Sequence, residues 1–198
     1  MTNIAFRKLH RKTSLIVFLP LLLTALTGIA YRLGRSWFGM SKEVAEIFMV
    51  IHQGEYLGDQ LKPIYVVLLG LGLLGMVVTG LTMTRLSRNS RLQKKYTKVD
   101  FRRIHQLVAP IIFLPLVVSS ITGIGYRVTR SYLGWTKDQS EIFLVIHQGE
   151  YLGDFFKPIY VLLVGLGLLG MLVTGINMTT LFRKRRVVKS EEKIEEED

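Results

Sequence analysis

An internal repeat constrains this chain more than any other feature of its sequence. The 198 residues align with themselves, without gaps, at a shift of 95 positions. Of the 40 residues in 46–85, 31 are identical to their counterparts in 141–180. The start of each copy diverges more, although residues 18–21 still match residues 113–116. A tandem copy of this quality predicts that both halves adopt the same fold and meet around a pseudo-two-fold axis.

Each copy contains two apolar runs of membrane length. They cover about residues 15–34 and 62–84 in the first copy, and 107–129 and 157–180 in the second. A helix needs about 20 apolar residues to cross the hydrocarbon core of a bilayer. We therefore predict an all-α, integral membrane four-helix bundle, with its pseudo-two-fold axis along the membrane normal. Apolar residues spaced for a helix in the two intervening loops predict a short interfacial helix in each.

Basic residues predict how the chain is organised and oriented. The first two-span unit should occupy residues 1–95, the second 96–185, and a charged tail 186–198. Eighteen of the 26 Lys and Arg residues lie in the two terminal tails and the central loop. By the positive-inside rule these segments are cytoplasmic, in a bacterial inner membrane or a thylakoid membrane. Basic loops beside membrane spans also account for the net charge of +11 without any nucleic-acid partner, and lipid is the expected neighbour.

All four histidines occupy repeat-matched positions, His10 with His105 and His52 with His147. The first pair should lie at the cytoplasmic ends of spans one and three, and the second pair on the opposite side. The helix from residue 10 to residue 32 would be about 33 Å long, so His10 and His52 cannot share a ligand. Two facing imidazoles suit haem iron, which axial histidines hold in helical bundles. We predict two haem b groups, with one histidine pair ligating each iron.

Arginines near the expected outer ends of spans one and three are also duplicated. Arg32 and Arg35 recur as Arg127 and Arg130. Guanidinium groups pair well with carboxylates, so we predict that these arginines bind the propionates of the outer haem. Arginine beside tyrosine is also an ordinary membrane-interface anchor, and that alternative stays open.

The expected function is transmembrane electron transfer by a dihaem b-type cytochrome, a membrane oxidoreductase that exchanges electrons with quinol or a redox partner protein. No catalytic residue is predicted, and the lack of cysteine excludes disulfides, cysteine-ligated clusters and covalently attached haem. Two other classes stay open. One is a non-catalytic subunit or assembly factor of a larger membrane complex, whose histidines would ligate chlorophyll if the membrane is photosynthetic. The other is a small transporter, which the absence of acidic residues from the four apolar runs disfavours.

Short motifs in both copies resemble the PepSY-associated transmembrane helix family. Residues 7–10, Arg-Lys-Leu-His, lead into Pro20-Leu21-Leu22 and Thr27-Gly28, and residues 103–105 lead into Thr122-Gly123, with Ile in place of Leu. Some members of that family resemble b-haem membrane reductases. The resemblance implies cytoplasmic-side ligation by His10 and His105, and less directly ligation by His52 and His147. The sequence departs from the family in having no extramembrane PepSY domain, so the resemblance does not imply an iron-chelate substrate.

Overall fold

The computed structural model describes residues 3–87 and 101–179, and every regular element in these ranges is a helix. The tail predicted for residues 186–198 lies outside them. Four long helices have the length and apolar character needed to cross a membrane, which confirms the predicted all-α membrane bundle. They are α1 (Asn3–Ser36), α3 (Gly58–Ser87), α4 (Phe101–Ser131) and α6 (Gly153–Asn177).

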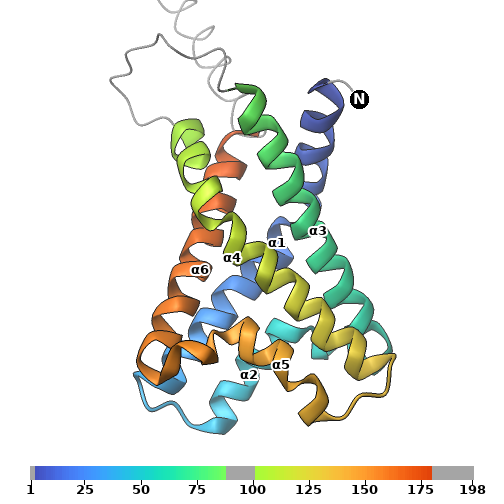
Figure 1. Cartoon of the computed structure of the whole chain (residues 1–198), viewed down its shortest axis with the longest axis vertical. Coiled ribbons are helices and arrows are strands. Elements are labelled where there is room, and N and C mark those ends of the chain that lie inside the picture. The colour runs from blue at the N-terminus through green and yellow to red at the C-terminus, as the bar shows by residue number, and fades with distance from the viewer. Residues whose placement is uncertain (1–2, 88–100, 180–198) are drawn as a thin grey trace, which may run out of the picture.

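In each repeat, one shorter helix lies between the two long helices (Figure 1). These are α2 (Lys42–Gln53) and α5 (Lys137–Gln148), and each is followed by a single 3-10 turn, η1 (Glu55–Leu57) or η3 (Glu150–Leu152). Both short helices lie across the same end of the bundle, opposite the end where α1 begins (Figure 1). We call the end with α2 and α5 the outer end, and the other the inner end.

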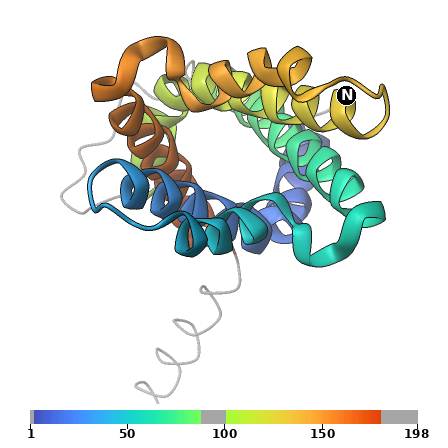
Figure 2. The same cartoon turned by 90° about the horizontal axis from the view of Figure 1, so that it is seen from below.

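The four long helices follow one another around the bundle in the order α1, α3, α4, α6 (Figure 2). Helices α1 and α4 therefore lie on one diagonal, and α3 and α6 on the other. Contacts of α3 with α4 and of α1 with α6 join the two repeats. Each repeat thus contributes two helices to one closed ring, as the duplication requires.

Glycines allow the repeats to approach closely along these contacts. A β-carbon at Gly70 would lie 2.6 Å from Cγ1 of Ile124, and one at Gly165 would lie 2.5 Å from Cγ1 of Ile29. Membrane helices lack a hydrophobic driving force for association and rely on such close packing of small residues. These glycines therefore hold the helices at the spacing that the interior of the bundle requires.

Local capping signals determine where the short helices begin and end. The hydroxyl of Ser41 accepts from the backbone N–H of Val44 at the start of α2, and Thr136 forms a capping box with Gln139 at the start of α5. Both helices end at a glycine in the left-handed conformation, Gly54 (φ 70°) and Gly149 (φ 69°). The short helices expected in these two loops are therefore present.

Candidate cofactor sites

Two cavities lie inside the bundle, and each is lined by one repeat-matched pair of histidines. The outer cavity, of about 280 Å³, is lined by His52 and His147. The inner cavity, of about 360 Å³, is lined by His10 and His105. Small-molecule pockets begin at roughly 300 Å³, so both cavities are near the lower end of that range. The structure brings together the same two pairs that the repeat brings together in the sequence.

A layer of four leucines separates the two cavities. Leu21, Leu73, Leu116 and Leu168 each line both cavities, and they form two repeat-matched pairs. Three of the four are buried, with Leu21 the most buried at 3% exposure. An apolar layer of this kind offers water no hydrogen-bonding partner. The two sites are therefore distinct compartments within one bundle.

The outer histidines are spaced like two ligands of a single metal ion. The ring centres of His52 and His147 are 6.4 Å apart, and their planes make an angle of 68°. Two imidazoles on opposite sides of one metal ion, each with a bond of about 2.0 Å and about 1.2 Å from the nitrogen to the ring centre, would have ring centres roughly 6.4 Å apart. The observed spacing fits one metal ion between the two rings.

Hydrogen bonds hold the outer imidazoles in one tautomer. Nδ1 of His52 lies 2.9 Å from the carbonyl oxygen of Thr24, and Nδ1 of His147 lies 3.0 Å from that of Ser119. A carbonyl oxygen can only accept, so Nδ1 carries the proton and Nε2 keeps its lone pair. Histidines that ligate metals use this arrangement, with the second ring nitrogen donating to a backbone carbonyl.

The inner imidazoles are held in the same tautomer by threonine hydroxyls. Nδ1 of His10 lies 2.8 Å from Oγ1 of Thr79, and Nδ1 of His105 lies 2.7 Å from Oγ1 of Thr174. Each hydroxyl already donates its single hydrogen to its own helix, at the carbonyl of Gly75 or the equivalent glycine. It therefore accepts from the imidazole. Within residues 3–87 and 101–179, no hydrogen bond engages Nε2 of any of the four histidines.

Every histidine also lies against the glycine of a Thr-Gly pair. A β-carbon at these glycines would lie 3.0 to 3.7 Å from Cε1 of the neighbouring imidazole. Only at Gly28 is this distance shorter than an ordinary van der Waals contact, so there the missing side chain makes room for the ring of His52. The contacts between these glycines and the imidazoles were not predicted from the sequence, although Thr-Gly occurs in every span at repeat-matched positions. The contacts pair Gly28 with His52, Gly123 with His147, Gly80 with His10, and Gly175 with His105.

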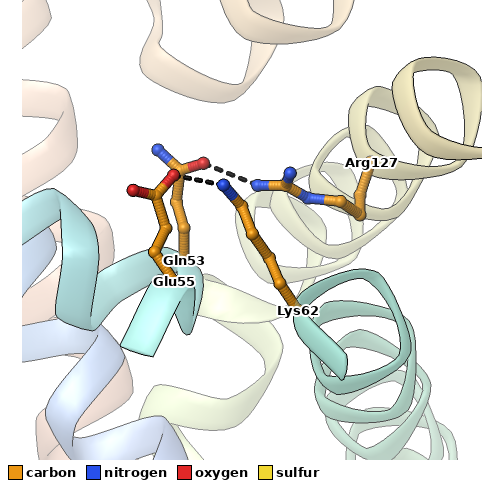
Figure 3. A network of polar contacts seen from close by, with 4 residues as sticks. All are labelled: Gln53, Glu55, Lys62 and Arg127. Carbon is orange, nitrogen blue, oxygen red and sulfur yellow. Dashed lines mark hydrogen bonds and ion pairs between the residues drawn. The ribbon is translucent and has the colours of Figure 1, made fainter. Parts of the chain in front are cut away.

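Two of the four predicted arginines line the outer cavity and are buried. Arg32 and Arg127 are 9% and 8% exposed, and each donates to a glutamine of the other repeat. Arg127 reaches Oε1 of Gln53 at 2.6 Å (Figure 3), and Arg32 reaches Gln148. Among the residues that the structure describes, the Nε atoms of both arginines are buried and have no hydrogen-bond partner. A buried donor without an acceptor is costly, and both arginines line the outer cavity.

The other two predicted arginines lie elsewhere. Arg35 and Arg130 are exposed and do not line the outer cavity. Each donates to a backbone carbonyl 2.7 Å away, at Met40 or Trp135, in the loop that follows its own helix. These contacts support the loops that lead into α2 and α5.

Ion pairs flank the outer arginines. Lys62 pairs with Glu55 close to Arg127, as Figure 3 shows, and Lys157 pairs with Glu150 in the second repeat. Glu55 and Glu150 also attract Arg127 and Arg32, so four basic groups share two carboxylates and these six residues have a net charge of +2. The outer site therefore carries the charge that a ligand with two carboxylates would neutralise.

The outer histidines are kept neutral by their surroundings. Burial lowers the pKa of His52, and the neighbouring His147 lowers it further. Burial also lowers the pKa of His147. Because only a neutral imidazole has a lone pair to offer a metal, both rings are in the protonation state needed for ligation at neutral pH.

No family model, curated protein or solved structure matches this chain. The geometry of the two cavities and the chemistry of their linings are therefore the basis on which a function is assigned.

Proposed function

We propose that this chain is a b-type membrane cytochrome that binds one haem in each cavity and carries electrons across the bilayer. The observation that supports this most directly is the pair of imidazoles in each cavity. One comes from each repeat, Nδ1 is held by a hydrogen bond, and Nε2 is left for a metal. The distance of 6.4 Å between the ring centres of the outer pair also agrees with ligation of one metal ion by both imidazoles.

The protein ligands favour iron within a macrocycle over a bare metal ion. In the described ranges, no group of three or more His, Cys, Asp or Glu side chains is placed to hold a metal. A metal held by two histidines alone needs its remaining ligands from another source. Haem supplies four nitrogens in one plane and leaves the two axial positions to the protein.

The charge of the outer cavity favours haem over chlorophyll. Haem b carries two free propionates, whereas the carboxyl groups of chlorophyll are esterified. Arg32 and Arg127 are largely buried, and both line the outer cavity. Two guanidinium groups related by the repeat suit two carboxylates, and burial strengthens such pairing.

The polypeptide would hold both cofactors. The four histidines would ligate the irons, Arg32 and Arg127 would hold the outer propionates, and the four-leucine layer lies between the two sites. When bound, each haem supplies a one-electron couple at its iron. The positive-inside rule supports a cytoplasmic inner end, and quinol or a redox protein is the proposed electron partner. The resemblance to PepSY-associated transmembrane helices agrees with this proposal.

Optical spectroscopy and haem counting of the purified, detergent-solubilised chain test the proposal. We expect a low-spin haem spectrum and two haems per chain. His10→Ala and His52→Ala should each remove one haem, a different one in each variant, while Arg35→Ala should keep both. A chain without a haem spectrum, or variants that retain both haems, would overturn the proposal.

A further inference from the structure

The hydrogen-bond acceptors that hold the histidines differ between the two ends of the bundle. The closest acceptors of the outer rings are the backbone carbonyls of Thr24 and Ser119, at 2.9 and 3.0 Å, while the hydroxyls of Ser119 and Thr122 are farther from Nδ1 of His147, at 3.4 and 3.3 Å. Side-chain hydroxyls of Thr79 and Thr174 hold the inner rings, at 2.8 and 2.7 Å. The four bonds have similar lengths, so the difference is in the chemistry of the acceptor.

Acceptor chemistry matters because the ring N–H transmits it to the metal. A stronger acceptor at Nδ1 makes the imidazole more basic and favours the oxidised state of a bound iron. A carbonyl is a stronger acceptor than a hydroxyl, although each of these hydroxyls is polarised by donating to a helical carbonyl at 2.7 or 2.6 Å. The inner rings therefore have a separate control over their basicity, and it is encoded by a side chain.

The placement of these hydroxyls in the fold is specific. Thr79 and Thr174 are both buried, at 6% exposure, and each comes from the neighbouring span of the same repeat. The glycine that follows each threonine lies beside the ring that the hydroxyl holds, since a β-carbon at Gly80 or Gly175 would be 3.5 or 3.7 Å from Cε1 of His10 or His105. The hydroxyl orients one imidazole that lines the inner cavity.

We infer that Thr79 and Thr174 are positioning residues for the inner haem, which orient its two axial histidines and set its redox potential independently of the outer haem. This inference rests on the proposed haem function. It assigns to the inner end a control on potential that side-chain substitution can change, whereas the carbonyl acceptors of the outer end cannot be removed by substitution.

A purely structural role for these threonines makes a different prediction. Threonine hydroxyls in helices often bond to the carbonyl four residues earlier, and such bonds bend the helix. Thr27 makes this bond to Leu23 at 2.6 Å, precedes a glycine and is buried, but none of its hydrogen bonds reaches a histidine. Thr27→Val is therefore a matched control for loss of the back-bond alone.

A potentiometric titration of the haem-loaded protein tests the inference, with haem content measured first. In Thr79→Val/Thr174→Val we expect one of the two potentials to rise and the other to keep its wild-type value. The g values of one low-spin ferric signal should change with it. Thr79→Ser/Thr174→Ser should keep both wild-type potentials, and so should Thr27→Val.

Each outcome either supports or overturns the role inferred for Thr79 and Thr174. Loss of one haem in the valine pair, with two haems in the serine pair and in Thr27→Val, would also support a positioning role. Wild-type potentials in the valine pair, or an equal shift in Thr27→Val, would overturn the inference and leave the proposed function intact. Wild-type protein that binds no haem would instead overturn the proposed function itself.

Discussion

At the outer end of the bundle the histidines come from the short helices α2 and α5, whereas at the inner end they come from the long helices α1 and α4. The inner rings are held within their own repeats, as in the bond from His10 to Thr79. At the outer end, polar bonds also cross between repeats, from Arg32 to Gln148 and from Arg127 to Gln53.

The two sites therefore depend on different parts of the fold. Gln53 and Gln148 immediately follow the outer histidines in sequence. The bonds that join the repeats are therefore built beside the ligands of the outer site. We expect the outer site to be sensitive to how the repeats associate, and the inner site to be sensitive to packing within each repeat.

We expect the largest effect from a glycine substitution that removes the outer haem and leaves the inner haem bound. A β-carbon at Gly28 would lie 3.0 Å from Cε1 of His52, so the branched side chain of Gly28→Val should displace that ring. We expect the variant to bind one haem in place of two and to keep the inner haem. Haem per chain and the redox titration measure this. Gly75→Val is the control, because no described residue beyond the neighbouring turns of its own helix comes within 4 Å of a β-carbon at Gly75. Two haems in Gly28→Val would contradict the proposed position of His52 against Gly28.

Loss of an outer arginine should weaken one haem without abolishing it. Truncating one member of a buried, hydrogen-bonded charge pair costs about 2–5 kcal/mol. We expect Arg127→Ala to weaken binding of the outer haem by that amount, and Arg127→Lys to restore part of it, since lysine keeps the charge and loses the planar fork. The rate of haem transfer to an excess of apo-myoglobin measures the loss. Exposed Arg35→Ala is the control, and an equal loss there would contradict the assignment.

Removing a cross-repeat glutamine should have a smaller effect, on the stability of the fold. Hydrogen bonds to charged groups contribute about 1.5–3 kcal/mol, so Gln148→Ala should lower the free energy of unfolding of the haem-free protein by that order. Denaturant unfolding in mixed micelles measures the change. In an Arg32→Ala background the same substitution should have almost no effect. Additive effects of the two substitutions would show that this bond does not couple the repeats.

The smallest expected effect is at the exposed carboxylates of the outer end. Glu55 pairs with Lys62 at a partly exposed site, with Glu55 at 38% side-chain exposure. Partly exposed ion pairs contribute about 1 kcal/mol or less and are screened by salt. Glu55→Gln should therefore lower stability slightly at low ionic strength and have no effect at high salt. A salt-independent loss would indicate that Glu55 acts through another contact.

Much of the fold was predictable because it depends on local properties of the chain. Apolar runs of membrane length predicted four spans, and the 95-residue shift predicted which histidines would meet. Capping residues such as Ser41 and Gly54 act within a few positions, so the limits of the short helices are also visible in the sequence.

The partners of the site residues were not predictable, because they depend on how helices rotate and slide against one another. Arg32 and Arg35 belong to the same turn of α1, yet only Arg32 reaches the outer cavity. The two residues could not be separated on sequence alone, since both are repeat-matched and both follow Tyr31 closely. Thr79 was missed for the same reason, because it lies 69 positions from the histidine that it holds.

The membrane bundle and its duplication can be read from the sequence, which also predicts the pairing of His10 with His105 and of His52 with His147. Length, hydrophobicity and repetition are properties of the chain, and they survive any choice of packing. The hydroxyl, carbonyl, glycine and guanidinium groups around each imidazole depend on how the helices pack, so they are known only from the tertiary structure. Those contacts join residues as far apart as Arg32 and Gln148, 116 positions along the chain, and only the packing of complete helices brings them within hydrogen-bonding distance.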